Sequence, residues 1–323
     1  MGRFTDMSIS APAVSIIVVN WNTRDLLRGC IASILAETQV PHEIIVIDNA
    51  SSDGSAGMVA AEFPEVRLIA NLGNQGFAAA NNQGLAIAQG QNVLLLNPDT
   101  VVLDHAIDRM LTWLAAQPEV GCVGCQVLEA PGVIQQTCFA DPTPANLTIT
   151  ELGLMRLARW FSIFGQPWYR SWDRCSERMV DVVSGMFMLV PRTVLNAVGP
   201  LDPAFFVYAE EADWCRRIRQ AGYTCIFSPV AQILHFDGGG KSTVQIKSRM
   251  HVQMQKSHLI YARKHHGAVG YMAVKALFVV SAALRVMAFS ILRLLRGGAL
   301  ASAHIRLSMA SLRYHLLGQD SVS

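Results

Sequence analysis

Several features are scarce or missing in this chain, and each absence excludes a class of protein. Only 15% of the 323 residues are charged and the formal net charge is +2, which argues against a nucleic-acid-binding surface. The first apolar run is followed by "NWNTRD" rather than by the GxGxxG pattern of dinucleotide-dependent oxidoreductases. The N-terminus lacks the apolar stretch of a secretory signal, and the seven cysteines are an odd number, so we expect a reducing cytoplasm.

Paired cysteines are also scarce. Cys122 and Cys125 form a single CxxC pattern in "GCVGC", and no second CxxC or CxxH follows it. A metal or redox pair is one interpretation of this motif. The alternative, which we favour, is that both are small residues in a buried strand.

Apolar, strand-like runs alternate with helical patterns from residue 14 to about residue 104. The runs predict strands at 14–20, 42–48, 66–71 and 92–97. The spacing of apolar residues predicts helices at 23–35 and 76–89. Near-continuous apolar strands separated by helices are typical of a parallel sheet covered on both faces, so we predict an α/β fold.

Polar clusters follow three of these strands: Asn20-Trp21-Asn22, Asp48-Asn49 and Asn97-Pro98-Asp99. Each cluster alone could be an ordinary turn or a helix cap. However, ligands of open α/β sheets bind outside the carboxyl ends of the strands. Three clusters at equivalent strand ends therefore predict one shared site.

The second half of the chain adds further candidates. Residues 126–180 are rich in aromatic residues, and they form either an acceptor-binding insertion or lid or an ordinary aromatic subdomain. A strand is expected at 179–192, with Gly185 at a point of close approach. The helix expected at 209–222 begins with three acidic residues. Negative charges at this end also interact favourably with the helix dipole, so they could serve a structural role alone. These acids are Glu210, Glu211 and Asp213. A strand then ends at His235, before three glycines.

The most apolar stretch is 275–298. At 100° per residue, its four cations occupy about 80° of a helical wheel and the rest is apolar. These cations are Lys275, Arg285, Arg293 and Arg296. A helix lying in the membrane interface would place them among anionic headgroups, and this is the arrangement we favour over a spanning helix or a helix packed on the protein's own core. Lys264, His265 and His266 add a basic flank.

Taken in order, the motifs resemble those of the family 2 glycosyltransferases, in particular the rhamnosyltransferase-like branch. The motifs are "VSIIVVNWN", "EIIVIDNASSDGS", "NQGFAAANNQG", "VLLLNPDT", "LDPAFFVYAEEADWCRRIRQAGY" and "ILHFDGGGKS". The resemblance implies a GT-A fold over residues 12–245, with a Rossmann-like, mostly parallel sheet. Residues 1–11 would then be a disordered N-terminus, and 246–323 an amphipathic helical extension associated with the membrane.

The resemblance also implies roles for single residues. The expected donor-binding residues are Val19, Trp21, Asp48, Asn74, Asn97 and Asp99. Asp99 and His235 would hold a divalent metal, either Mg²⁺ or Mn²⁺. Glu211 matches the position of the catalytic base, and acceptor contacts are expected from Gly185, Glu210 and Asp213. The sequence leaves open which of the three acids is the base.

The chain departs from the family pattern at several positions. Asn97 replaces the first acid of the DxD motif, so Asp99 is the one carboxylate of the motif that can balance the charge of the metal. Asn81 stands where an arginine is common, and Glu211 is one methylene longer than the usual aspartate. The QxxRW motif of processive synthases is missing. We therefore expect an inverting enzyme that adds a single sugar, with L-rhamnose from dTDP-rhamnose as the favoured donor.

The expected acceptor is polyprenyl-linked or a growing polysaccharide, and the expected location is the cytoplasmic face of the inner membrane. The alternatives are the same fold with galactofuranose, N-acetylglucosamine or mannose as the transferred sugar, or a non-catalytic nucleotide-sugar-binding protein.

Overall fold

The structure, a computed structural model, describes residues 11–157, 160–236, 247–296 and 298–318. The expected disordered N-terminus and the boundary between 245 and 246 fall almost entirely outside these ranges. The strands are β1 (Val14–Asn20), β2 (His42–Asp48), β3 (Arg67–Ala70), β4 (Asn92–Leu96), β5 (Thr100–Val102), β6 (Val120–Ala130), β7 (Val133–Ile134), β8 (Arg178–Met179), β9 (Phe187–Pro191) and β10 (Thr224–His235). The α-helices are α1 (Arg24–Glu37), α2 (Ser55–Glu62), α3 (Phe77–Ile87), α4 (Ala106–Ala115), α5 (Pro144–Glu151), α6 (Arg192–Val198), α7 (Glu210–Gln220), α9 (Lys247–Arg296) and α10 (Ala299–Leu317), and the 3-10 helices are η1 (Leu154–Leu157) and η2 (Ser162–Trp168).

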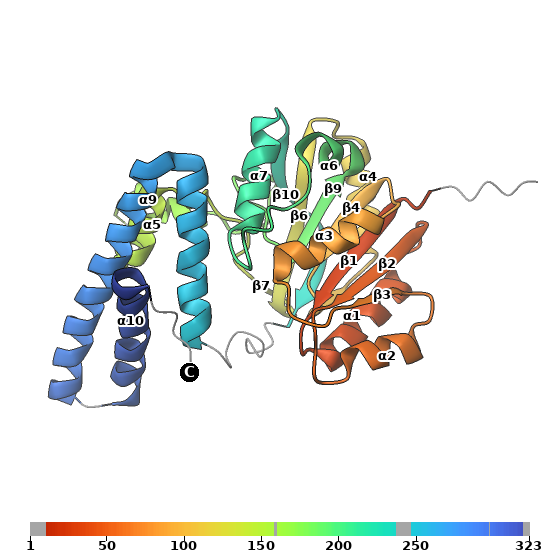
Figure 1. Ribbon diagram of the computed structural model, residues 1–323. Helices are drawn as coiled ribbons and strands as arrows, with labels where there is room; N and C mark the ends of the chain where they lie inside the picture. Colours follow the sequence, from red (N-terminus) through yellow and green to blue (C-terminus); the bar gives the residue numbers. More distant parts are fainter. Residues whose placement is uncertain (1–10, 158–159, 237–246, 297, 319–323) are drawn as a thin grey trace, which may run out of the picture.

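One mixed sheet organises the first 236 residues, with the strand order β3-β2-β1-β4-β9-β6-β10-β5. The pairs β2–β3, β1–β2, β1–β4 and β6–β10 are parallel, which confirms the predicted mostly parallel sheet. β9 lies antiparallel between β4 and β6. Figure 1 shows helices on both faces of this sheet.

Each face of the sheet has its own apolar core. Alternate residues of β1 point to opposite faces, so Ile16 packs with α1, α2 and α4, whereas Ile17 packs with α3, α6 and α7. Burying each such isoleucine contributes about 1.5–3 kcal/mol. α3 lies so close to β1 that a Cβ at Gly84 would be 2.6 Å from Cγ2 of Ile17, and glycine at this position permits the contact.

The sheet also decides between the two interpretations of the CxxC pattern. Cys122 and Cys125 both lie in β6 and both are buried. Residues three apart in a strand point to opposite faces, and these two cysteines belong to different cores. They cannot share a metal ion or form a disulfide, so they are buried core residues.

The prediction of one strand over 179–192 is wrong for the middle of that range. β8 and β9 are two separate strands, and residues 180–186 form no strand between them. Gly185 lies in a turn, where a Cβ would only meet the ring of Phe77 at 3.9 Å. The protein itself therefore makes no close approach to Gly185.

The C-terminal region is an assembly of long helices. α9 breaks at Gly267, whose φ of 66° and ψ of −161° are not helical. We call residues 247–266 the inner segment of α9 and residues 268–296 its outer segment. Figure 1 shows the inner segment beside α7, and the outer segment with α10 on the side away from the sheet. Leu147 of α5 packs with residues of both segments in a small separate core.

One cation of the outer segment is not available to a membrane surface as the helical wheel predicted. Arg285 donates from Nη2 to the carbonyl oxygen of Glu151 (2.6 Å), and the same Nη2 lies 3.0 Å from its carboxylate. This cation therefore faces α5. The exposed large apolar side chains of the outer segment are Val269, Met272, Val280, Leu284, Met287, Ile291, Leu292, Leu294 and Leu295. By length and composition, α9 is the one helix in the described residues that could cross a membrane.

Charge is distributed very unevenly along the chain. Residues 238–319 contain twelve Lys and Arg residues and no Asp or Glu, whereas residues 1–237 contain fourteen Lys and Arg residues against twenty-three acids. The small net charge of +2 therefore results from an acidic sheet domain and a basic helical region. The outer segment combines this basic character with an apolar surface.

Candidate active site

The carboxyl ends of β1 and β2 meet at one edge of the sheet. Asn20 and Asp48 are partners in the register of these strands, and both are buried. The carboxylate of Asp48 accepts hydrogen bonds from Nδ2 of Asn20 (2.9 Å) and from the backbone N–H of Ser51 (3.0 Å). Each carboxylate oxygen can accept a further bond, so Asp48 is fixed in place yet retains acceptor capacity.

The glycine-rich segment after β3 is tied to this edge through Asn49. The Asn49 amide donates to Oδ1 of Asn74 (2.9 Å) and accepts from the N–H of Gln75 (2.9 Å). Oδ1 of Asn74 also accepts from the N–H of Gly76 (2.9 Å). The side chain of Asn74 is exposed, so it lies at the surface of the segment that is expected to border the donor.

The stretch after β4 forms a tight turn that leads into β5. The carbonyl oxygen of Asn97 accepts from the Thr100 hydroxyl (2.8 Å), and its N–H donates to the carbonyl of Met186 (3.2 Å). Thr100 is paired with His235 across β5 and β10. This pairing places Nε2 of His235 3.3 Å from Oδ1 of Asp99. Residues 136 positions apart in the chain are thus brought together.

The Asp99–His235 pair fits a divalent cation. Oδ1 of Asp99 is buried and has no hydrogen-bond partner among the described residues. Nδ1 of His235 lies 3.1 Å from Oε1 of Gln135, an acceptor, so in the neutral imidazole Nδ1 carries the proton and Nε2 has its lone pair towards Asp99. No group of three or more His, Cys, Asp or Glu that could hold a metal occurs in the described ranges, so a cation here needs ligands from a bound diphosphate and water.

Two acids at the start of α7 carry abnormal pKa values. Glu210 is buried and Glu211 is partly exposed, and Oε2 of each is buried without a hydrogen-bond partner in the part of the chain that the structure describes. Burial, reinforced by the charge of Glu211, raises the pKa of Glu210 well above its usual value. Burial also raises the pKa of Glu211 to about 7. A carboxyl that titrates near neutral pH suits a general base.

The third acid has a different role. Asp213 is completely buried, and its carboxylate pairs with Arg217, Lys264 and His265. Burial alone would raise the pKa of Asp213, but hydrogen bonds from His265, Lys264 and Arg217 outweigh it and lower the pKa to about 2. The expectation that Asp213 contacts an acceptor, or serves as the base, is wrong in this structure. Lys264 and His265 likewise face this acid rather than forming the basic flank expected of them.

Glu210 and Glu211, which we call the acid pair, are connected through α3 to the glycine-rich segment after β3. Gly76 has a φ of 83°, and a Cβ there would collide with the carbonyl oxygen of Phe206. That same oxygen accepts from the N–H of Phe77 (2.6 Å). The amide of Asn82 exchanges two hydrogen bonds with the backbone of Leu201 (2.8 and 3.1 Å). The loop at 201–209 is therefore held against the helix that follows the glycine-rich segment.

The remaining candidates have simpler surroundings. Val19 is buried in the core below the edge, and Trp21 is half-buried just after β1. Asn81 is buried, and its amide donates to the carbonyl of Phe77 (2.9 Å), so it does not replace the missing arginine as a phosphate contact. Gln135 was missed from the sequence, because only the β6–β7 hairpin brings it to His235.

Comparison with known proteins agrees with this geometry. Residues 15–135 match the family model described as "Glycosyl transferase family 2". Over these residues the chain is similar to the family 2 glycosyltransferases. This confirms the enzyme class predicted from the ordered motifs, and the mostly parallel sheet flanked by helices is the GT-A fold.

Two curated relatives and one solved structure are similar to most of this chain. It is 24% identical, over 78% of this chain and 85% of the relative, to an N-acetylglucosaminyl-diphospho-decaprenol L-rhamnosyltransferase of Mycobacterium tuberculosis. It is 27% identical, over 71% of this chain and 18% of the relative, to an O-antigen biosynthesis protein of Myxococcus xanthus. A mannosyltransferase from Pyrobaculum calidifontis, solved with GDP-Man and Mn²⁺, superimposes with a TM-score of 0.55 at 18% identity, over 97% of this chain and 89% of that one. The last likeness shows a shared fold.

Proposed function

We propose that this glycosyltransferase uses a divalent metal and inverts the anomeric carbon as it transfers L-rhamnose from dTDP-rhamnose to a hydroxyl of a polyprenyl-diphosphate-linked sugar. The observation that carries the proposal is the pairing of an unsatisfied carboxylate oxygen of Asp99 with the free Nε2 of His235. This pair lies at the carboxyl end of the sheet, where the polar ends of β1 and β2 also lie. The rhamnosyltransferase relative supports the choice of sugar and of lipid-linked acceptor.

Donor binding follows from the residues at this edge. Asp48 would accept a hydrogen bond from the N–H of a pyrimidine ring, and Trp21 would lie beside the base. Asn74 and Asn97 border the sugar and the phosphates. Asp99 and His235 would hold a Mg²⁺ or Mn²⁺ ion, which when bound supplies Lewis-acid neutralisation of the departing diphosphate. Gln135 keeps the proton on Nδ1 of His235, so that Nε2 remains a ligand.

Proton removal is assigned to the two acids at the start of α7. Two neighbouring buried carboxyls do not both ionise at neutral pH, so Glu210 keeps its proton while Glu211, with a pKa of about 7, ionises. The ionised Glu211 takes the proton of the acceptor hydroxyl, and the oxygen attacks the anomeric carbon on the face opposite the diphosphate. Protonated Glu210 can donate a hydrogen bond to the acceptor.

The lipid-linked acceptor implies work at a membrane, and the basic helical region suits that place. We assign the outer segment of α9 to the surface of the inner membrane, on its cytoplasmic face. Its exposed apolar side chains would enter the interface, while nearby Lys and Arg residues attract anionic headgroups. The apolar face is the one expected from the helical wheel, but Arg285 faces α5 instead of the headgroups.

A donor panel tests the proposal. The purified chain is incubated with Mn²⁺, N-acetylglucosaminyl-diphospho-polyprenol and one of several donors: dTDP-rhamnose, UDP-galactofuranose, UDP-N-acetylglucosamine or GDP-mannose. Product formation and nucleoside diphosphate release are measured. We expect dTDP-rhamnose to give the highest rate, and Asp99→Ala to abolish turnover while Glu65→Ala, exposed before β3 at the opposite edge, leaves it unchanged. Preference for another donor would refute the assignment of the sugar. Full activity without divalent metal would refute the assignment of the cation, and tight nucleotide binding without transfer would indicate a non-catalytic protein.

A further inference from the structure

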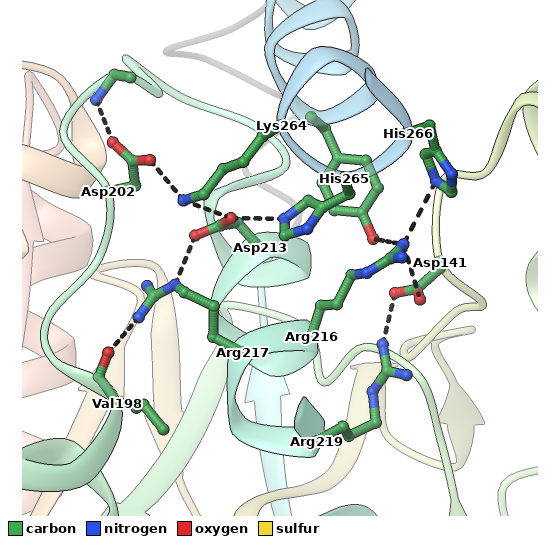
Figure 2. Close-up of polar contacts among 12 residues, drawn as sticks. Asp141, Val198, Asp202, Asp213, Arg216, Arg217, Arg219, Lys264, His265 and His266 are labelled. Carbon is green, nitrogen blue, oxygen red and sulfur yellow. Dashed lines mark hydrogen bonds and ion pairs between the residues drawn. The ribbon is translucent and has the colours of Figure 1, made fainter. Parts of the chain in front are cut away.

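The acid pair, Glu210 and Glu211, is held from the side of the C-terminal region by a cluster of charges around the buried carboxylate of Asp213. In this cluster, drawn in Figure 2, Oδ1 of Asp213 receives Lys264 Nζ at 2.8 Å and His265 Nε2 at 2.7 Å, while Oδ2 receives Arg217 Nε at 2.9 Å. The Asp213 side chain is completely buried, and that of His265 is 6% exposed. Breaking such a buried ion pair from one side leaves an uncompensated charge, so the cluster is a strong constraint on α7.

The inner segment of α9 also contacts the loop before the acids. Lys264 Nζ lies 2.6 Å from Oδ2 of Asp202, so one ammonium joins residues on both sides of Glu210 and Glu211. About two turns earlier in α9, the hydroxyl of Ser257 donates to the carbonyl of Val207 at 2.7 Å. These contacts fix the chain three residues before the acid pair and two residues after it.

The backbone between these two anchor points is strained. Tyr208 and Ala209 have φ values of 71° and 65°, in the left-handed region that residues other than glycine rarely adopt. Consecutive conformations of this kind persist only where the surrounding structure holds them. They set the direction in which α7 begins, and therefore where the side chains of Glu210 and Glu211 point.

We propose that Lys264 and His265 are positioning residues of the transferase reaction, which hold the acid pair at the start of α7 in its reactive orientation through Asp213 and Asp202. The inference rests on the proposed role of Glu211 as base. It makes the inner segment of α9 part of the catalytic apparatus. Because α9 continues into the outer segment, the same helix joins the reacting acids to the surface assigned to the membrane.

The test compares single variants of the full chain with dTDP-rhamnose and N-acetylglucosaminyl-diphospho-polyprenol as substrates. Lys264→Ala and His265→Ala should lower kcat about 10-fold to 100-fold, since small displacements of reacting groups have effects of this size. KM for the donor should stay within about twofold, because the donor-binding edge is untouched. Lys264→Arg and His265→Gln, which retain a donor to Asp213, should recover most of the rate. Arg263→Ala, which removes an exposed cation next to the cluster, should match the wild type.

A measurement without substrates keeps the test valid if the alanine variants are poorly folded or if another donor is used. Hydrogen exchange of the amides at 205–213 should quicken in His265→Gln slightly and in His265→Ala strongly, but not in Arg263→Ala. Unchanged exchange, or full kcat in both alanine variants alongside an inactive Glu211→Gln, would overturn the positioning role and leave the proposed function standing. Wild-type turnover in Glu211→Gln would instead overturn the assignment of the base, and the positioning role with it.

Discussion

Replacing Glu211 by glutamine should stabilise the protein at alkaline pH while it removes activity. Burial raises the pKa of Glu211 from 4.5 to about 7. Between these two values, the folded chain holds a proton that the unfolded chain has released, so raising the pH through this window destabilises the fold. Each pKa unit corresponds to about 1.4 kcal/mol, so the charged carboxylate destabilises the wild type by roughly 3 kcal/mol above pH 7.

Glutamine has nearly the same shape and no charge. Near pH 4 the wild type and Glu211→Gln should therefore unfold at similar temperatures, and by pH 8.5 the variant should unfold about 6 °C higher, at roughly 2 °C per kcal/mol. Thermal unfolding followed by circular dichroism at both pH values measures the difference. Glu65→Gln, at an exposed position, is the matched control and should follow the wild type throughout.

The same titration should appear in the kinetics. The wild-type kcat/KM should rise about tenfold per pH unit below pH 7 and level off above it, because only ionised Glu211 accepts the proton. Unfolding temperatures of wild type and variant that stay parallel from pH 4 to 8.5 would refute the reasoning, since they would mean that Glu211 is not held protonated by its surroundings.

Three further outcomes are expected. His235→Ala should weaken Mn²⁺ binding in the presence of dTDP about 10-fold to 100-fold by isothermal calorimetry, and Gln135→Leu should weaken it less; equal affinity in all three proteins would contradict the cation site. Leu284→Asp combined with Met287→Asp should reduce sedimentation with phosphatidylglycerol vesicles at least tenfold, with no change in the unfolding temperature, because both side chains are exposed in the apolar face; unaltered sedimentation would exclude that face as the contact. Asp48→Asn should weaken dTDP binding without lowering Mn²⁺ affinity for the nucleotide complex, and a loss of both would indicate that the whole edge has rearranged.

Local patterns were sufficient to predict the parallel half of the sheet. The apolar runs at 14–20, 42–48 and 92–97 form β1, β2 and β4 almost residue for residue, because strands buried on both faces need continuous apolar sequence. Since parallel strands end at one edge, the polar residues after them also had to meet there. The register of Asn20 with Asp48 is the direct result.

The rest depended on contacts between distant parts of the chain. β9 inserts antiparallel between β4 and β6, and no feature of its apolar sequence indicates its direction. Asp213 looked like its neighbours Glu210 and Glu211. Arg217 of the same helix supplies one of the cations that set it apart, but the other two come from the packing of α9 on α7. The helical wheel described Arg285 correctly as part of a cationic arc, but it could not reveal that Glu151 covers it.

The uneven distribution of charge has a consequence for how the enzyme meets a surface. An acidic sheet domain joined to a basic helical region makes the molecule an electric dipole along its length. Near an anionic bilayer, the field turns such a molecule before any apolar side chain makes contact, with its basic end towards the lipid and its acidic end away. Dissolved ions screen the electrostatic attraction, whose range is about 8 Å at physiological salt. The alignment should therefore weaken as salt is added. The enzyme would thus arrive already oriented, with its acidic sheet domain left in solution.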